Sequence, residues 1–420
     1  MSMRLLFPKM LWVFVMLTGV GPAQGQWSRI PLPGDHPEVF ALVTHTNGEL
    51  FIGTGGLPNS TTNAIGILSS DDQGTTVTAR CNGLKNTRFD RLFRSLINSD
   101  QSLVAASADG TYFSENGGEN WEKRANGLPV LARTSMQSAN ALVSLGDQIF
   151  CGTPEGVYKT VDQGIHWLKT SSGLTNPDVR ALARLDKLLF ASTDGDGIYR
   201  SSDGGANWTR SGQGIPANVH SRALIANDGV VLAGTTMGTY RSVDQGETWT
   251  TTLPNANARS FAAGNGLIAV GAFRGNGIVY VSYDRGEHWT NVSGNLPSAM
   301  GVWAMALDDT NLYAAVARQG LWRIPLSELK TLQNRPDAGT SPNTGGTPLP
   351  QERLGRRGNL PGVRQNLLAL DSNGDGKLTR DEIPPRVQRI LSEADIDRDD
   401  VLDSEEIAGF LRQIGPGSPN

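Results

Sequence analysis

The chain has 420 residues, which is enough to bury one or more sizeable hydrophobic cores. Its formal net charge of -4 excludes the strongly basic surface on which nucleic-acid binding depends, and we expect no nucleic-acid partner. The 50 Gly and 22 Pro residues are typical of a fold made of many short strands joined by tight turns.

Residues 1–25 have the features of a secretory signal peptide. Arg4 and Lys9 give a basic start, the apolar run LWVFVMLTGV follows, and GPAQG offers small residues before a cleavage site. The apolar run is too short to span a bilayer, and an uncleaved membrane anchor is the alternative. We therefore predict an exported protein, periplasmic or extracellular, with no transmembrane segment after cleavage.

One eight-residue phrase occurs six times in the middle of the chain. Its pattern is Ser/Thr-x-Asp/Asn-x-Gly-x-x-Trp, and only the first copy lacks the tryptophan. The copies begin at Ser70, Ser114, Thr160, Ser201, Ser242 and Ser282. The tryptophans, at positions 121, 167, 208, 249 and 289, are 46, 41, 41 and 40 residues apart. This spacing is the period of a four-stranded propeller blade.

Three stretches of alternating apolar residues accompany each phrase, and they predict three β-strands followed by a hairpin turn. The last repeat ends after its third stretch and has no phrase. The segment QWSRIPLP, residues 26–33, matches the fourth-strand segment NWTRSGQGIP of residues 207–216. We therefore predict an all-β, seven-bladed β-propeller over residues 26–330, in which residues 27–30 supply the outer strand of the last blade. Such closure removes exposed sheet edges.

The repeated phrase has the composition of a structural turn. Its Ser/Thr and Asp side chains can accept hydrogen bonds from the backbone N–H groups of their own turn, and its Gly allows a positive φ. The phrase resembles the Asp-box, or BNR repeat, of sialidases, sortilin-type receptor domains, xyloglucan-degrading glycosidases and photosystem II assembly factor propellers. The resemblance covers about residues 27–329. It implies the fold, and it implies that the phrase lies on the face away from the ligand.

A column of residues in the first strands should meet at the ring mouth on the opposite face. The column comprises Phe40, Arg91, Asn140, Arg180, Arg222, Arg259 and Trp303. The residues that we predict to bind a ligand are Arg91, Arg180, Arg222, Arg259 and Trp303. Clustered guanidinium groups suit carboxylate, sulfate or phosphate groups, so the predicted partner is an acidic glycan or a protein. Alternatively, the arginines are solvated or paired with Asp90, Asp178 and Asp194.

A glycoside hydrolase of the sialidase-like or xyloglucanase-like kind is the alternative function. Such an enzyme needs two carboxylates that flank the scissile bond. Asp90, Glu155, Asp194 and Asp196 are candidates by location only, and we assign no catalytic residue.

The composition changes after the propeller. Residues 331–362 are rich in Pro, Gly, Thr, Asn and Arg and predict a disordered linker. Residues 363–414 are predicted to form a small α-helical EF-hand pair. The first loop, DSNGDGKLTRDE, has its calcium ligands at Asp371, Asn373, Asp375, Lys377, Thr379 and Glu382. Lys377 contributes its backbone carbonyl.

The second loop is DIDRDDVLDSEE, and it also provides six ligand positions. They are Asp395, Asp397, Asp399, Val401 (by its carbonyl), Asp403 and Glu406. The loop departs from the pattern at its sixth position, where Asp400 replaces Gly with some backbone strain. The eighth positions, Leu378 and Leu402, are apolar and can pair.

The tail resembles EF-hand pairs appended to secreted bacterial proteins and, more distantly, dockerin modules. The resemblance implies calcium as the cofactor, and an acidic, solvated helix pair is the alternative. We therefore predict an exported calcium-binding protein whose propeller is a binding or assembly module. A purely structural envelope protein is a third possibility.

Overall fold

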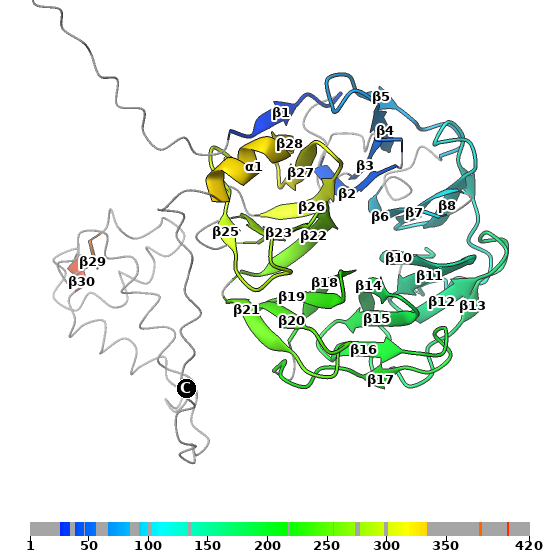
Figure 1. Ribbon diagram of the computed structural model, residues 1–420. Coiled ribbons are helices and arrows are strands. Elements are labelled where there is room, and N and C mark those ends of the chain that lie inside the picture. Colours follow the sequence, from blue (N-terminus) through cyan, green and yellow to red (C-terminus); the bar gives the residue numbers. More distant parts are fainter. Residues whose placement is uncertain are drawn as a thin grey trace, which may run out of the picture. The chain divides into compact units, whose positions relative to one another are not determined.

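The computed structural model describes residues 26–333, apart from 34–37, 46, 56–65, 85–91, 100–101, 133–135, 217–218, 255, 274–277 and 298–300, and also residues 378–379 and 401–402. The chain divides into two units, Met1–Asn343 and Thr344–Asn420. In the first unit, seven four-stranded antiparallel sheets form a ring, which confirms the predicted all-β, seven-bladed propeller (Figure 1).

Blades 1 to 3 are antiparallel sheets whose strands follow chain order from the centre of the ring outward (Figure 1). Blade 1 comprises β2 (Glu38–Thr44), β3 (Leu50–Gly55), β4 (Ile67–Ser70) and β5 (Thr78–Ala79). Blade 2 comprises β6 (Phe93–Asn98), β7 (Leu103–Ser107), β8 (Gly110–Ser114) and β9 (Glu122–Lys123). Blade 3 comprises β10 (Ala141–Leu145), β11 (Gln148–Thr153), β12 (Gly156–Thr160) and β13 (Leu168–Lys169).

Blades 4 to 6 repeat the same order of strands. Blade 4 comprises β14 (Val179–Leu185), β15 (Leu188–Thr193), β16 (Gly197–Ser201) and β17 (Thr209–Arg210). Blade 5 comprises β18 (Ser221–Asn227), β19 (Val230–Thr235), β20 (Gly238–Ser242) and β21 (Thr250–Pro254). Blade 6 comprises β22 (Ala258–Gly264), β23 (Leu267–Ala272), β24 (Val279–Ser282) and β25 (Thr290–Asn291).

Blade 7 combines the two ends of the propeller, as the sequence predicted. Its inner strands are β26 (Val302–Leu307), β27 (Asn311–Val316) and β28 (Gly320–Pro325), and its outer strand is β1 (Ser28–Ile30). The helix α1 (Leu326–Gln333) follows β28 directly and lies beside it (Figure 1). The apolar pattern of the sequence does not predict this helix. No helix in the described part of the chain is long and apolar enough to cross a membrane.

Trp27 fastens the outer strand of blade 7 to blade 6. Its backbone N–H donates to Oδ1 of Asn295 at 2.7 Å, and its indole Nε1 donates to the carbonyl of Val292 at 2.8 Å. The indole is also buried in the apolar core of these two blades. The ring is therefore closed by a residue from its first strand segment.

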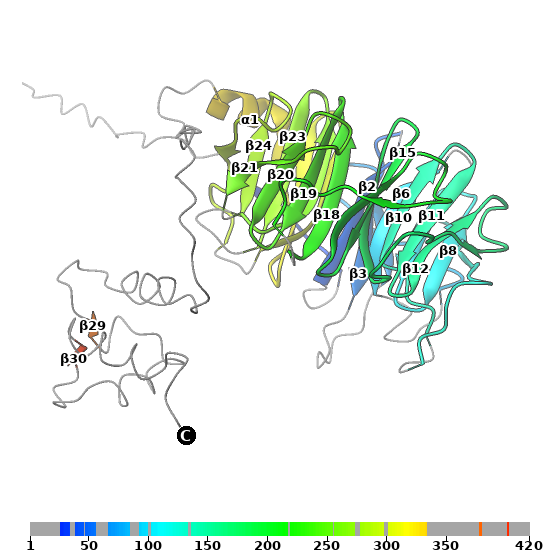
Figure 2. The ribbon, with the colours of Figure 1, turned by 90° about the horizontal axis from the view of Figure 1, so that it is seen from below.

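The hydrophobic core lies between the faces of neighbouring blades. The innermost strand of each blade contacts the innermost strands of its two neighbours, and β26 contacts β2. In Figure 2 three of them, β2, β6 and β10, lie side by side near the middle of the ring. Phe51 of blade 1 is buried in one cluster with Tyr112 and Trp121 of blade 2. Burial of such side chains at each junction stabilises the closed ring.

The repeated phrase forms the turn between the third and fourth strands of blades 1 to 6. In blade 4 the Ser201 hydroxyl donates to Asp203 at 2.8 Å and accepts from the Gly205 N–H at 3.0 Å. The Asn207 N–H donates to Asp203 at 2.9 Å, and this bond is the largest cause that lowers the pKa of Asp203 from 3.8 to about 2. The same pattern recurs in the other five turns. The hydroxyl and the carboxylate are thus engaged within their own turn.

Each turn also fastens its blade to the preceding one. Gly205 has a φ of 82° and lies against Phe150 of blade 3, where an added Cβ would stand 2.8 Å from the ring. Trp208 donates its backbone N–H to the Ser172 carbonyl and its indole Nε1 to the Thr170 carbonyl, both at 2.8 Å. Glycine is required in this turn because its φ is positive and a side chain would collide with the neighbouring blade.

Two short strands are described in the second unit. β29 (Leu378–Thr379) and β30 (Val401–Leu402) pair antiparallel, with Leu378 opposite Leu402. These residues hold the eighth positions of the two predicted loops, so the pairing expected between them is present. The helices and the other ligand positions of the predicted EF-hand pair lie outside the described residues, as does the predicted linker beyond residue 333.

Replacement of Trp27 by Ala should destabilise the protein by about 3–5 kcal/mol, because the buried indole and its hydrogen bond to Val292 are lost. Trp208→Ala, at the equivalent position of an uninterrupted blade, should have a similar cost. Ser28→Ala on the exposed side of β1 should change the free energy of unfolding by less than about 0.5 kcal/mol. Chemical denaturation measures all three. A Trp27→Ala variant as stable as the parent would contradict closure by β1.

Candidate functional site

The mouth of the ring is lined by residues that bulge from the innermost strands. In six blades the pairing of the first and second strands shifts by one residue, at Phe40, Arg94, Arg180, Arg222, Arg259 and Trp303. In blade 3 Asn140 holds the same place, because Asn140 and Ala141 both lie opposite Gly152. A β-bulge re-aims the side chain of its extra residue. These seven residues line a cavity of about 210 Å³.

The structure brings together four of the five mouth residues that the sequence predicted, namely Arg180, Arg222, Arg259 and Trp303. In blade 2 the mouth position belongs to Arg94 and not to Arg91, which lies outside the described residues. The segment DRLFRSL contains two arginines three positions apart, so its alignment is ambiguous. The distinguishing signal is that every mouth residue precedes Ala or Ser and then a large apolar residue. Arg94-Ser95-Leu96 fits this signal, and residues 91–93 do not.

Arg180 is the ion-paired arginine of the mouth. Its Nη2 donates to Oδ2 of Asp178 at 2.6 Å and to Oδ2 of Asp194 at 2.8 Å. Oδ1 of Asp194 lies 2.5 Å from Nδ1 of His220. Burial raises the pKa of Asp178, although the Arg180 charge opposes this. Burial would also raise the pKa of Asp194, but the hydrogen bond to His220 and the Arg180 charge outweigh burial, so the pKa of Asp194 is lowered. Pairing with aspartates, the alternative expected from the sequence, therefore applies to Arg180.

Arg94 lies on the same side of the mouth. Its Nη1 donates to Oγ of Ser138 at 2.7 Å and to Oδ1 of Asn140 at 2.9 Å. Asn140 in turn donates to the carbonyl of Val179 at 2.9 Å. Burial is the largest cause that lowers the pKa of Arg94, and the charge of Arg180 lowers it further. A guanidinium group stays protonated at neutral pH despite such a shift, so two like charges are held near each other.

Arg259 lies over two aromatic rings on the other side of the mouth. Its guanidinium carbon lies 4.4 Å from the ring centre of Phe273 and 5.0 Å from that of Trp303. Trp303 stacks on Phe273 at 5.7 Å and makes a tilted contact with Phe40 at 6.1 Å. Burial and the charge of Arg222 lower the pKa of Arg259 to about 10, so Arg259 is protonated at neutral pH. The Nε of Arg259 and the Nε1 of Trp303 are buried without a hydrogen-bond partner in the described structure.

Arg222 lies between these two sides and is exposed to the cavity. Of the four mouth arginines, only Arg180 forms an ion pair with a described residue. Arg222 and Arg259 therefore contribute positive charge outside any described ion pair, although the charge of Arg222 still helps to lower the pKa of Asp194. Such guanidinium groups can bind a carboxylate through two parallel hydrogen bonds. The aromatic rings beside them offer an apolar surface to the rest of a ligand.

Among the described residues, Asp178, Asp194 and Asp196 do not form an open pair of carboxylates at the mouth. Asp178 and Asp194 bind the same nitrogen of Arg180. Asp196 accepts hydrogen bonds from the hydroxyl groups of two neighbouring side chains. Asp90 lies outside the described residues. A glycoside hydrolase holds its two carboxyl groups on either side of the scissile bond, roughly 5–10 Å apart. Here a guanidinium group occupies the space between the two aspartates of the mouth.

Comparison with known proteins agrees with a propeller. The DUF6242 beta propeller domain matches residues 130–261 of the chain. A search of curated protein sequences finds no match. Among solved structures, the extracellular domain of the putative one component system BT4673 from B. thetaiotaomicron is similar, with a TM-score of 0.57 and 16% identity. The similarity covers 72% of this chain and 40% of that chain, so this chain matches well under half of that protein's length.

Three further structures share the fold. YCF48 from Cyanidioschyzon merolae has a TM-score of 0.52 and 16% identity, over 72% of this chain and 99% of that chain. A structure of YCF48 bound to D1 peptide has a TM-score of 0.51 and 18% identity, over 71% and 96% of the two chains. The GH74 xyloglucanase from Xanthomonas campestris has a TM-score of 0.53 and 16% identity, over 72% and 54%. At such identities the likeness shows the fold alone.

Arg180→Met should make the stability of the protein depend on pH in a new way. Without the Arg180 cation, the half-buried Asp178 keeps only the weaker influence of the Arg94 charge, and its folded-state pKa rises further above the unfolded value. The variant should lose about 1 kcal/mol at pH 7 and less at pH 4.5, because the folded state then takes up a proton. Arg222→Met, which removes no described ion pair, should show little change at either pH. Urea denaturation at both pH values measures this, and an equal loss at both would contradict the pairing.

Proposed function

We propose that the ring mouth binds an acidic partner and that the protein acts as a binding or assembly module. The observation that carries this proposal is that Arg222 and Arg259 both line the mouth and neither forms an ion pair with a described carboxylate. A charge-assisted hydrogen bond contributes about 1.5–3 kcal/mol, so two such groups are enough to select a carboxylate ligand. We also infer that the repeated turns are Asp-boxes, since their hydrogen bonds match the structural role of that repeat.

A protein segment with carboxylate side chains is the ligand that we favour. Trp303 and Phe273 place aromatic surface beside Arg259, and this combination suits an acidic side chain next to an apolar one. The likeness to YCF48, which has a structure bound to D1 peptide, supports a peptide ligand on this fold. An acidic glycan is the other ligand class, and the experiment below separates the two.

Glycoside hydrolysis is less well supported. A retaining or inverting hydrolase needs one carboxyl group as a general acid and a second as a nucleophile or base, with the substrate between them. Asp178 and Asp194 are instead bridged by Arg180, which holds both close to one cation. The likeness to a xyloglucanase concerns the fold and does not supply this missing pair.

Binding of a hexaglutamate peptide should weaken about tenfold or more in Arg222→Met and in Arg259→Met, because each loses a charge-assisted contact. Arg241→Met, on the third strand of blade 5, is the matched control and should bind like the parent. Fluorescence anisotropy with labelled peptide measures the affinities. Raising the salt concentration should weaken binding in the parent protein.

Hexagalacturonate carries the same number of carboxylates as C-terminally amidated hexaglutamate and tests the glycan class. Preference for the peptide supports a protein partner, and preference for the sugar without release of reducing ends supports a glycan-binding module. Release of reducing ends would favour the glycoside hydrolase over the binding module. Equal affinity of the parent and both mouth variants for both probes would overturn the proposed site.

We further propose that the protein is exported and that its tail binds calcium. The signal-peptide pattern of residues 1–25 supports export. The antiparallel pairing of Leu378 with Leu402 supports calcium binding by the tail, because it joins the two predicted loops at matching positions. Oxygen-rich loops of this spacing hold calcium with six to eight ligands, and extracellular modules bind it at about 10⁻⁴–10⁻³ M. At such an affinity, bound calcium would stabilise the fold of the tail, and the tail would not act as a calcium sensor.

Calcium titration of the full chain should show two sites with dissociation constants of about 10⁻⁴–10⁻³ M. Glu382→Gln and Glu406→Gln should each remove one site, because the twelfth position supplies the bidentate carboxylate. Glu352→Gln, in the predicted linker, is the matched control. Calorimetry measures the sites, and far-ultraviolet circular dichroism measures helix formed on binding. Identical titrations of the parent and the loop variants would contradict an EF-hand pair.

A further inference from the structure

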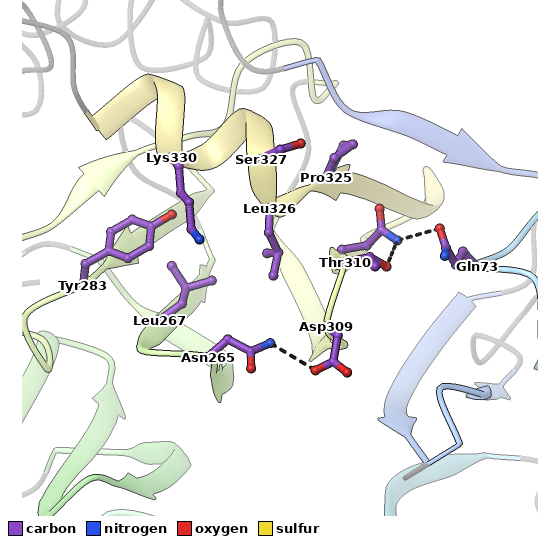
Figure 3. A pocket seen from close by; sticks show the side chains of 11 residues that line it. Gln73, Asn265, Leu267, Tyr283, Asp309, Thr310, Pro325, Leu326, Ser327 and Lys330 are labelled. Carbon is purple, nitrogen blue, oxygen red and sulfur yellow. Dashed lines mark hydrogen bonds between the residues drawn. The ribbon is translucent and has the colours of Figure 1, made fainter.

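A second and larger hollow of about 700 Å³ lies on the opposite face of the propeller, at blades 6 and 7 (Figure 3). Its wall includes Tyr283 in the repeated turn of blade 6, Gln73 in that of blade 1, and Lys330 of α1. Between these two turns the ring of turns has a gap, because blade 7 has no repeated phrase. The hollow therefore occupies the place of the missing turn.

The other junctions show what fills this place elsewhere. In four of the six turns the glycine lies against a large side chain on the second strand of the preceding blade, whereas Gly164 meets Phe113 on the third strand of blade 2 and Gly74 meets Ile30 of β1. Gly205 contacts Phe150, Gly246 contacts Phe190, and Gly286 contacts Leu232. At the junction of blades 6 and 7 no such glycine exists, since the chain continues from β28 into α1.

Blade 6 is adapted to the missing turn. Strand pairing places Phe190 opposite Arg200 in blade 4, and the equivalent pair in blade 6 is Ala269 and Val281. Arg200 donates to the carbonyl of Gln245 in the next turn, a contact for which blade 6 has no partner. Ala269 and Val281 are buried in one core cluster with Leu329 of α1, so the helix covers the part of blade 6 on which a turn would pack. The hollow lies between this helix and the neighbouring turns.

Polar groups stand at the two ends of the hollow. In Figure 3 the amino group of Lys330 and the hydroxyl of Tyr283 lie toward one end, and Asn265 and Asp309 lie at the other. Within the described residues Lys330 has no ion pair and the Tyr283 hydroxyl has no hydrogen bond. Burial raises the pKa of Tyr283, so its hydroxyl stays protonated and can donate.

The other end of the hollow accepts hydrogen bonds. One oxygen of Asp309 takes a long bond of 3.5 Å from the side-chain amide of Asn265, and its second oxygen has no partner among the described residues. Leu267 and Leu326 lie between the two ends and form an apolar middle (Figure 3). Small-molecule sites have this form, with volumes of roughly 300–1,000 Å³ and a few convergent polar groups.

We propose that this hollow binds a small zwitterionic molecule of the amino-acid or short-peptide class. Its carboxylate would meet Lys330 and Tyr283, its ammonium group would meet Asp309, and its apolar side chains would cover Leu267 and Leu326. The site is separate from the ring mouth, and neither proposal depends on the other.

The test uses the full chain and three apolar dipeptides, leucyl-leucine, leucyl-phenylalanine and phenylalanyl-leucine, titrated separately by ligand-observed NMR. At least one should bind saturably. Its amide and its N-acetyl form should each bind about tenfold more weakly, because each lacks one of the two charges. Lys330→Met should weaken binding of the dipeptide about tenfold and should leave the affinity of its amide unchanged.

Lys169→Met is the matched control, since Lys169 is exposed on the outer strand of blade 3. It should bind all probes like the parent. Asp309→Asn should weaken binding of the dipeptide and leave the affinity of its N-acetyl form unchanged, so that the two bind equally well. Absence of saturable binding by all three dipeptides, or equal effects of Lys330→Met and Lys169→Met, would overturn the proposal.

Discussion

Closure of the ring by the three residues of β1 is the contact on which the rest of the structure depends. The last blade lacks a fourth strand of its own, and β1 completes it by pairing with β28. Trp27 then takes the place that a tryptophan of the repeated phrase holds in other blades. Because the ring closes, every innermost strand faces the same axis. Bulged residues as distant in the sequence as Phe40 and Trp303 therefore meet at one mouth.

The two faces of the propeller use the same repeats for different purposes. On one face the hydroxyl and the carboxylate of each turn are bound within the turn, so a repeated turn offers few free groups to a ligand. On the other face each blade contributes one bulged side chain, and these differ from blade to blade. The exception on the first face is the gap at blade 7. There the irregular end of the repeat leaves Lys330 and Tyr283 around a hollow.

Sequence periodicity predicted the seven blades and the split blade, because local turn chemistry repeats with the blade and leaves a visible trace. It placed Arg180, Arg222, Arg259 and Trp303 at one mouth for the same reason. In blade 2 the periodicity predicted Arg91 at the mouth where the structure has Arg94, because the bulge that sets the mouth position depends on strand pairing. It left open whether Arg180 is paired, since Asp178 and Asp194 reach it from two different loops. The helix α1 was not predicted, because it follows the last repeat and its packing against β28 has no counterpart in the repeated sequence.

Hydrogen–deuterium exchange of the full chain with and without hexaglutamate tests ligand binding at the ring mouth most directly, because it maps the site without any substitution. We expect slower exchange at the starts of β14, β18, β22 and β26, where the mouth residues bulge toward the cavity. The repeated turns on the opposite face should exchange at unchanged rates. Protection confined to those turns, or no protection anywhere while the peptide is bound, would contradict a ligand site at the ring mouth.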